Sequence, residues 1–336
     1  MRRFNQSVVI VTLLMFMGGA GQGVGQSLSI YQIQSNTVDG DATVFHFDEV
    51  ECDGGIVVAK FLGSRPRVIL RDPRNPDAWA AIQVKDWTAG DLFNNVAIGD
   101  WVALANMLVE EYRGTTFLQW QTPYNPRFSI VSTGNPLPPP MRMDVEEMPA
   151  PTYDAASDGW YVANHGAEPF ESMRLYVRDV TVTAKNLGKA VDNYSLQTAD
   201  GYDCWAADYM NANRGPSGYH PFVRVGRHFC AVAGVFEQYT NLGEGWDYYQ
   251  LVTVTTADLA ICGDGDSDGD VDLADWPRFW ECLTGPVCDS GGCDPPAWAV
   301  APLELDLERC LMMDQDYDGD VDLRDAAVFC GRFGAP

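Results

Sequence analysis

The chain has 336 residues, of which 22 are lysine or arginine and 47 are aspartate or glutamate, so its formal net charge is −25. This surplus of acid, with no basic stripe along the chain, argues against binding to the phosphate backbone of nucleic acid. The length allows two or three domains, each large enough to bury a core of its own.

Residues 1–25 have the pattern of a secretory signal peptide. Two arginines come first, an apolar run extends from Val8 to Met17, and small residues follow. The run is shorter than the roughly twenty residues that a membrane helix needs, and signal peptidase cleaves after small residues. We predict cleavage between Gly21 and Gln26, and a secreted protein that is extracellular or held at the cell surface. No later segment is apolar over a length that would span a membrane.

Residues 27–260 contain a tandem repeat. Three pairs of segments are similar at an offset of 126 or 127 residues: 79–81 with 205–207 (both WAA), 98–101 with 225–228, and 109–112 with 236–239. A constant offset over several segments predicts a duplicated domain.

Both copies are rich in short segments typical of β-strands. Examples are GIVVAKFL and WVALANMLVEEY in the first copy, and RLYVRDVTVTA and FCAVAGVFEQY in the second. About five such strands per copy favour a small barrel. The order of the segments resembles the OB-fold domains of secreted bacterial proteins. We therefore expect a mainly β protein with two tandem OB-like barrels, over 27–133 and 152–260, joined by a proline-rich linker over 134–151. A β-sandwich such as a carbohydrate-binding module is the alternative.

The resemblance implies a polymer-binding face on each barrel. OB folds hold oligonucleotides or oligosaccharides on their second and third strands, by stacking on aromatic side chains. Because the charge argues against nucleic acid, a glycan or another polymer is the expected ligand. Aromatic residues on strands belong to a core more often than to a site, and the repeated Trp79 and Trp205 are expected to be packing landmarks. The candidate platforms are Trp79, Trp101, Trp120, Trp205, Trp246, Tyr248 and Tyr249.

Two twelve-residue stretches near the C-terminus have the layout of a calcium loop. DGDSDGDVDLAD begins at Asp264 and DQDYDGDVDLRD begins at Asp314, with Gly269 and Gly319 at position 6. Calcium takes about six to eight oxygen ligands, and the glycine allows the chain to turn sharply round the ion. We predict two Ca2+ ions, with a solvated acidic loop as the alternative. Position 7 would offer its backbone carbonyl and position 9 a carboxylate or a water. The expected ligands are Asp264, Asp266, Asp268, Asp270, Asp272 and Asp275, and Asp314, Asp316, Asp318, Asp320, Asp322 and Asp325.

The pair of loops resembles a dockerin module over roughly residues 262 to 334. Position 12 is aspartate in both loops, position 8 is valine (Val271 and Val321), and apolar residues follow each loop at helical spacing. Dockerins attach secreted proteins to cohesin modules. The resemblance therefore implies a small α-helical, calcium-binding module over 261–336 and a cohesin-like protein partner. The expected apolar helix faces are Trp276, Phe279, Trp280 and Leu283, and Ala326, Phe329, Cys330 and Phe333.

Nine cysteines in a secreted chain predict disulfides, and six of them lie in residues 261–336. The two-fold arrangement of paired loops favours Cys262 with Cys330, Cys282 with Cys310, and Cys288 with Cys293. A zinc site is the competing interpretation. Cys204 pairs with Cys230 and leaves Cys52 odd, or these three are buried free thiols.

No catalytic motif is evident. His46, His165, His220 and His228 lack the spacing of metal ligands or of a nucleophile's base. We predict a secreted, calcium-binding, non-catalytic binding or attachment protein. The alternative is an accessory or catalytic component of an extracellular polysaccharide- or nucleic-acid-degrading system. In a third interpretation, the calcium and the disulfides only stabilise the fold.

Overall fold

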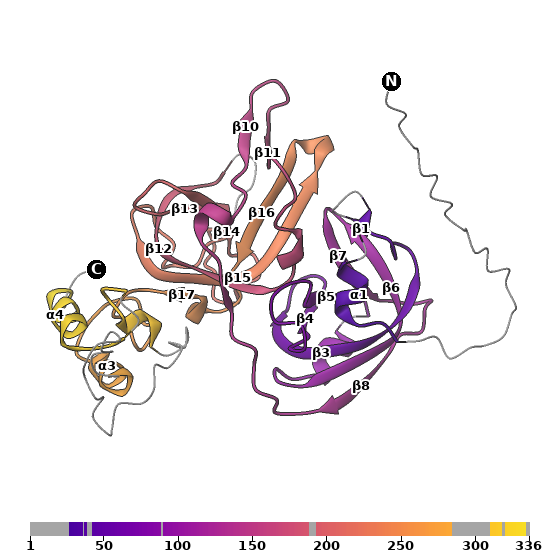
Figure 1. Cartoon of the computed structure of the whole chain (residues 1–336), viewed down its shortest axis with the longest axis horizontal. Coiled ribbons are helices and arrows are strands. Elements are labelled where there is room, and N and C mark those ends of the chain that lie inside the picture. The colour runs from indigo at the N-terminus through magenta and orange to yellow at the C-terminus, as the bar shows by residue number, and fades with distance from the viewer. Residues whose placement is uncertain are drawn as a thin grey trace, which may run out of the picture.

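The structure is a computed structural model that describes residues 27–35, 37–38, 42–88, 90–187, 193–283, 310–317 and 320–333. Two β-barrels lie side by side, and the described part of the C-terminal tail (residues 261–333) lies against the second barrel, on the side away from the first (Figure 1). Within the described part of the chain, no helix is long and apolar enough to cross a membrane. The expected signal peptide, Cys288, Cys293, Asp318 and Gly319 lie outside the described residues.

Five strands close the first barrel. Their order is β3-β4-β5-β7-β6, and β6 returns to pair with β3. The pair β5–β7 is parallel and the other pairs are antiparallel. This is the OB-fold arrangement, a five-stranded Greek-key barrel. The strands are β3 (Glu49–Phe61), β4 (Arg67–Arg71), β5 (Ala81–Asp86), β6 (Trp101–Tyr112) and β7 (Thr115–Trp120).

Apolar side chains from these strands fill the first barrel, because alternate residues of a strand face inward. Helix α1 (Ile30–Ser35) packs on β3 and β5 and buries Ile30 and Ile33 completely. Strand β3 passes so close to β6 that a Cβ atom at Gly54 would lie 1.6 Å from the Val102 carbonyl oxygen. The smaller elements here are β1 (Thr37–Val38), β2 (Ala42–Thr43), α2 (Asp91–Asn95) and β8 (Arg127–Ser132), which pairs with β6.

The second barrel repeats this topology. Its order is β12-β13-β14-β16-β15, closed by β15 with β12, and its parallel pair is β14–β16. The shared topology agrees with the predicted duplication. Trp101 begins β6 and His228 begins β15, and the glycine two residues before each strand has a φ of 88° or 87°. The strands are β12 (Arg174–Lys185), β13 (Asn193–Gln197), β14 (Asp203–Ala207), β15 (His228–Asn241) and β16 (Trp246–Val252).

One of the three repeated segments is not equivalent in the two barrels. Trp79 precedes β5, has a φ of 55° and is only half-buried, whereas Trp205 lies within β14 and is buried. The register of the two WAA segments also differs. The last alanine of the second segment, Ala207, pairs with the first residue of β13, whereas the last alanine of the first segment, Ala81, pairs with the last residue of the equivalent strand β4. The expectation that both tryptophans are core landmarks is therefore wrong for Trp79.

Much of the expected linker belongs to the second barrel. Strand β9 (Met141–Arg142) pairs with β12, and Met143, Val145 and Met148 lie in the core of that barrel. Only the stretch between Ser132 and Met141 connects the two barrels without joining a sheet. The other short elements are η1 (Val145–Glu147), β10 (Thr152–Asp154), β11 (Gly159–Tyr161), η2 (Glu168–Phe170), η3 (Leu242–Glu244), η4 (Thr256–Asp258) and β17 (Leu259–Ala260).

The two barrels share a buried interface. Arg67 of β4 donates a hydrogen bond to Glu237 of β15 at 2.8 Å, and Thr116 N–H donates to Glu171 Oε1 at 3.1 Å. An apolar cluster continues from one barrel into the other, so the barrels form a packed pair. Its buried members are Ile56, Val58, Ala59 and Ile69 of the first barrel and Met210, Val235, Val252 and Val254 of the second.

Candidate metal centres

The described part of the tail has two short α-helices, one after each acidic loop. They are α3 (Trp276–Cys282) and α4 (Leu323–Gly331), and η5 (Leu311–Met313) precedes the second loop. Phe279 and Phe329 are fully buried and stack with ring centroids 5.1 Å apart, as the helical spacing predicts. Trp280 and Cys330 are exposed, so their placement on the apolar faces is wrong.

The tail core is continuous with the second barrel. Ala231 and Ala233 of β15 and Ala260 of β17 lie in the same apolar cluster as Phe279 and Phe329. Because small side chains on β15 allow close approach, η5 packs directly on this strand, and α3 and α4 contribute to the same apolar cluster. The tail is thus part of a common core in this structure, and a separate helical module is not evident.

The disulfides were only partly foreseen. Cys282 bonds to Cys310 with a Cα–Cα distance of 5.3 Å, as expected. The predicted pair Cys262–Cys330 is wrong, since Cys262 bonds to Cys230 of β15 with a Cα–Cα distance of 4.9 Å. The pairing of β17 with β15 matches Ala260 with Ala231 and so carries Cys262 to its partner. Cys230 is therefore unavailable to Cys204.

The remaining described cysteines are free thiols: Cys52, Cys204 and Cys330. Cys52 and Cys204 are buried, and burial raises the pKa of each thiol to about 12. A thiol with so high a pKa is unreactive. The alternative of buried free thiols is therefore right for Cys52 and Cys204 and wrong for Cys230, which is disulfide-bonded.

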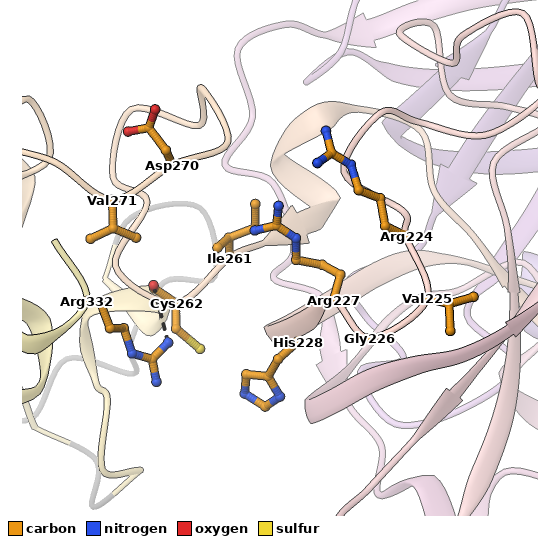
Figure 2. Close-up of a pocket in the computed structure, with 10 residues that line it drawn as sticks. All are labelled: Arg224, Val225, Gly226, Arg227, His228, Ile261, Cys262, Asp270, Val271 and Arg332. Carbon is orange, nitrogen blue, oxygen red and sulfur yellow. Dashed lines mark hydrogen bonds between the residues drawn. The ribbon is translucent and has the colours of Figure 1, made fainter. Parts of the chain in front are cut away.

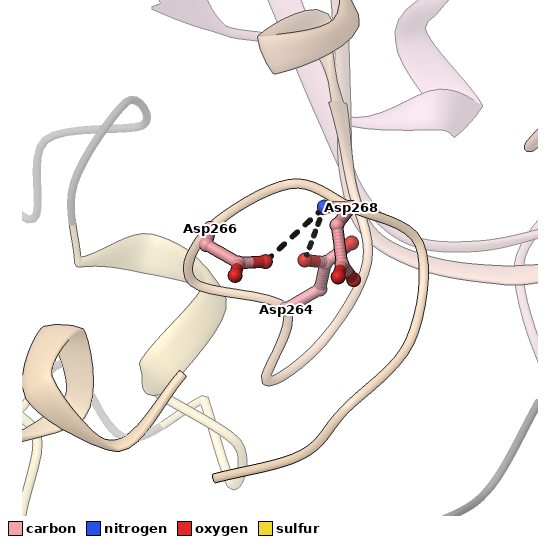
Figure 3. A group of neighbouring side chains, drawn as sticks. All are labelled: Asp264, Asp266 and Asp268. Carbon is pink, nitrogen blue, oxygen red and sulfur yellow. Dashed lines mark hydrogen bonds between the residues drawn. The ribbon is translucent and has the colours of Figure 1, made fainter. Parts of the chain in front are cut away.

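The first acidic loop brings three carboxylates together. Oxygen atoms of Asp264, Asp266 and Asp268 lie within 4.8 Å of one another. The Asp268 N–H lies between the first two side chains and donates to Asp264 Oδ1 at 3.1 Å and Asp266 Oδ1 at 3.3 Å (Figure 3). Asp264 Oδ2 accepts from Gly269 N–H at 3.0 Å. The left-handed φ of 104° at Gly269 supplies the sharp turn that was predicted.

The aspartate at position 12 organises the backbone of both loops in the same way. Asp275 Oδ1 accepts from Gly265 N–H at 2.6 Å and its Oδ2 from Asp272 N–H at 2.7 Å. Asp325 does the same, with Gln315 N–H at 2.5 Å and Asp322 N–H at 2.8 Å. The described parts of the two loops thus share this hydrogen-bond arrangement, which follows from their common spacing.

The second loop contains a buried carboxylate that is tied to the second barrel. Asp314 is fully buried, and its Oδ2 accepts from the Arg178 guanidinium of β12 at 3.0 Å. Its Oδ1 has no hydrogen-bond partner among the described residues. A buried carboxylate oxygen without a donor is costly, and a cation at this position would satisfy it. The all-oxygen donor set fits a hard divalent ion such as calcium.

The electrostatics of both loops favour a bound cation. Burial, with repulsion from Asp275, raises the pKa of Asp264 to about 6. Burial and the nearby Asp316 likewise raise the pKa of Asp325 to about 6. Charged carboxylates are thus held where they repel one another and lack full solvation. A divalent cation would relieve both penalties and displace protons as it binds.

The expected ligands are only partly assembled. In the second loop, carboxylate oxygens of Asp314, Asp316 and Asp325 form one close group, and those of Asp320, Asp322 and Asp325 form another. In the first loop, Asp270 and Asp272 are exposed and lie outside the group of three. Asp270 was expected to contribute only its backbone carbonyl. Sequence reasoning missed Arg178, whose role depends on a contact between distant segments.

The other candidates fall into cores and surfaces. Every close group of metal-ligand side chains among the described residues consists of aspartates, and none contains a histidine. Trp120 and Tyr249 belong to the barrel cores, and Trp101 is half-buried between the barrels. A separate aromatic cluster on the second barrel contains Trp205, Trp246 and Tyr248, with Trp160 and Tyr239 packed against it.

Part of this cluster lines a cavity of about 460 Å3 between the barrels. Tyr112 and Arg113 come from the first barrel, and Tyr239, Trp246 and Tyr248 come from the second. The Arg113 guanidinium lies over both Tyr112 and Tyr239, and it hydrogen-bonds to the Tyr239 hydroxyl. Aromatic rings beside planar polar groups are typical of sites for sugars or other flat polar ligands.

Comparison with known proteins finds no matching family model and no matching curated protein. Among solved structures, Schizosaccharomyces pombe Pot1pC bound to ssDNA is 14% identical over 30% of this chain and 88% of its own, with a TM-score of 0.23. A murine DNA-binding protein bound with double-stranded DNA is 9% identical over 61% and 94%, with a TM-score of 0.29. Fission yeast Pot1 with ssDNA is 12% identical over 69% and 85%, with a TM-score of 0.25. The strand pairings described above, and not these distant likenesses, define the OB fold here.

Proposed function

We propose that this chain is a secreted, calcium-binding, non-catalytic protein that attaches to a partner protein through its tail. The observation that carries the proposal is the pair of acidic loops whose position-12 aspartates accept equivalent backbone hydrogen bonds, with a buried Asp314 oxygen that has no donor among the described residues. The first ion would be held by Asp264, Asp266, Asp268, Asp272 and Asp275 with the backbone carbonyl of Asp270. The second would be held by Asp314, Asp316, Asp318, Asp322 and Asp325 with that of Asp320.

Calcium would supply positive charge where the tail lacks it. Residues 260–336 contain 18 acidic and 4 basic residues by count from the sequence, so the metal-free tail repels itself. Two divalent ions would neutralise four of these charges and fix both loops. The tail helices and their contact with β15 would then be stabilised by calcium.

An attachment role is supported by matched apolar residues on the tail surface. Leu273 and Leu323 both stand at position 10 of their loops, and they are 76% and 82% exposed. Trp280 is 65% exposed nearby in sequence. Large apolar side chains exposed at equivalent positions indicate a surface for protein recognition. In the dockerin resemblance, positions 10 and 11 usually face the cohesin partner. Here they are Leu-Ala and Leu-Arg, which departs from the usual pattern, and we propose a cohesin-like protein as the partner.

Calcium binding is tested by calorimetry on the full chain without its first 25 residues. The expected result is two calcium ions per chain and a higher melting temperature in calcium than in EGTA. Asp264→Asn together with Asp314→Asn should abolish both effects, while Asp91→Asn in the first barrel should leave them intact. Absence of bound calcium in the unchanged protein would refute the proposal.

Attachment is tested by capturing partners from the medium in which the protein is secreted, with calcium or with EGTA. Leu273→Ser with Leu323→Ser should lose a partner that the unchanged protein retains in calcium, at unaltered calcium affinity. Equal capture by the variant would leave the tail with a stabilising role alone.

A second candidate function rests on the cavity between the barrels. We propose that this cavity binds a neutral glycan, since two arginines (Arg67 and Arg113) and two glutamates (Glu237 and Glu244) line it beside the aromatic rings and leave no net charge to attract a polyanion. Titration with neutral oligosaccharides should quench tryptophan fluorescence, and Tyr239→Ala should remove the effect. Preferential binding of single-stranded DNA would overturn this assignment.

A further inference from the structure

A second cavity lies at the junction of the second barrel and the tail. It has a volume of about 460 Å3, and Figure 2 shows its walls. The segment that enters β15 contributes Arg224, Arg227 and His228, and the tail contributes Arg332 and Asp270. Arg332 points toward this junction from the tail, opposite the segment that carries Arg227 and His228 (Figure 2). The cavity therefore exists only when the tail lies against the barrel.

The charge in this cavity is opposite to that of the rest of the molecule. Three guanidinium groups line it against a single carboxylate. Arg224 donates to the Pro221 carbonyl oxygen at 3.1 Å and Arg332 to the Cys262 carbonyl oxygen at 3.4 Å. Neither these two arginines nor Arg227 forms an ion pair with a described carboxylate. The chain has a net charge of −25, so three unpaired arginines at one place are not explained by a general excess of base.

The guanidinium groups of Arg224 and Arg227 are close enough to affect one another. Burial lowers the pKa of Arg227, and repulsion from Arg224 adds to the effect, while Asp264 of the first loop partly offsets it. His228 also faces Arg332, and burial with that repulsion lowers its pKa, although Asp179 acts in the opposite direction. Like charges held together without partners gain free energy when an anion binds between them.

The shape of the cavity indicates the kind of anion. Planar guanidinium groups bind the oxygens of sulfate or phosphate through paired hydrogen bonds. Val225, Ile261 and Val271 add apolar wall, and a Cβ atom at Gly226 would meet nothing within 4 Å, so space remains beyond the charged groups. A polyanion would be repelled by the surrounding acidic surface. A small ligand with one charged ester group fits both features.

We propose that the junction cavity binds the oxyanion of a small sulfate or phosphate monoester, such as a sugar ester. The arginines grip the ester oxygens, and the apolar wall contacts the organic part. This site borders the first calcium loop, whose Asp270 and Val271 line it, but its proposed ligand-binding groups are guanidinium side chains. It extends the proposed function with a binding site that joins barrel and tail.

The test is calorimetry of the full chain, without its first 25 residues, with glucose 6-sulfate, glucose 6-phosphate and glucose as probes. We expect at least one ester to bind and glucose to show no binding, and the preferred ester identifies the natural oxyanion. Arg227→Gln or Arg332→Gln should each weaken ester binding about tenfold or more, as expected for loss of a charge-assisted hydrogen bond. The control Arg127→Gln changes an exposed arginine of β8 in the first barrel and should have no effect.

Three results would overturn the proposal: no binding of either ester, equal binding of glucose, or ester binding that survives Arg227→Gln combined with Arg332→Gln. Circular dichroism and the melting temperature of each variant show that the fold is kept. Calcium binding is measured separately on the same samples. Failure of the oxyanion site can therefore be told apart from failure of the calcium proposal.

Discussion

The contact between Arg178 and Asp314 couples the second calcium loop to the second barrel. Arg178 belongs to β12, and its side chain is 15% exposed, while that of Asp314 is 0% exposed. Their hydrogen bond occupies Oδ2 of Asp314 and leaves Oδ1 for an ion. Arg178 thus neutralises the first ligand of the loop and, being positive, opposes calcium at the same carboxylate.

The perturbation we consider is Arg178→Met, which keeps the length of the side chain and removes its charge. Removal of one partner from a buried ion pair costs about 3–5 kcal/mol, because the other charge remains buried. We expect this cost in EGTA. In calcium the ion compensates Asp314 directly, so the cost is smaller. Suppose that bound calcium offsets only about 1.4 kcal/mol of this destabilisation. Thermodynamic linkage then requires calcium to bind the second loop about tenfold more tightly in the variant than in the unchanged protein.

Two measurements check this reasoning. Calcium calorimetry gives the affinity of each loop, and hydrogen exchange of peptides from residues 310–333 in EGTA gives the free energy of local opening. The control is Arg142→Met, since Arg142 pairs with Asp144 at a comparable 2.8 Å but with 57% and 53% exposure. That exposed pair should contribute little. Unchanged or weaker calcium binding in Arg178→Met, or unchanged exchange in EGTA, would refute the coupling.

Three further predictions concern stability and pH. Phe329→Ala should destabilise the tail by about 3–5 kcal/mol, because the ring is fully buried against Phe279, and hydrogen exchange should accelerate in α4 but not in the first barrel. Burial and repulsion from Glu168 and Glu111 raise the pKa of Glu171 well above its usual value. The folded state therefore keeps a proton that the unfolded chain releases, and stability should fall as pH rises above the usual carboxyl range. Glu171→Gln should abolish this fall and raise the melting temperature at neutral pH, and an unchanged pH profile would contradict it. Calcium affinity should drop as pH falls below about 6, where Asp264 and Asp325 take up protons. A flat calcium affinity between pH 7 and pH 5 would count against the two loops as sites.

The barrels were predictable to the level of topology. The number and order of short strand-like segments, together with their repetition, predicted two OB-like barrels, and the strand pairings agree. The residues at which individual strands begin and end could not be predicted from the sequence. The WAA segments match in letters but not in register, because the start of β5 and the end of β14 happen to share small residues after a tryptophan.

The tail shows the limit of arguments based on internal symmetry. Two similar loops suggested a two-fold pattern of disulfides, and Cys282–Cys310 follows it. Cys262 instead bonds to Cys230, since β17 joins the sheet of the second barrel before the tail begins. Symmetry within the tail could not reveal that the tail shares a core with its neighbour.

The sequence by itself determined the features that depend on contiguous residues. The spacing of aspartates and Gly269 sets the shape of the acidic loop, and alternation along each strand sets which side chains face a barrel interior. Only the tertiary structure decided which distant groups meet: Cys230 with Cys262, Arg178 with Asp314, and the arginines of the junction cavity. The physical reason is that local geometry follows from backbone and spacing. Contacts between distant segments depend on how sheets and helices pack, and a linear pattern does not encode that packing in any readable form.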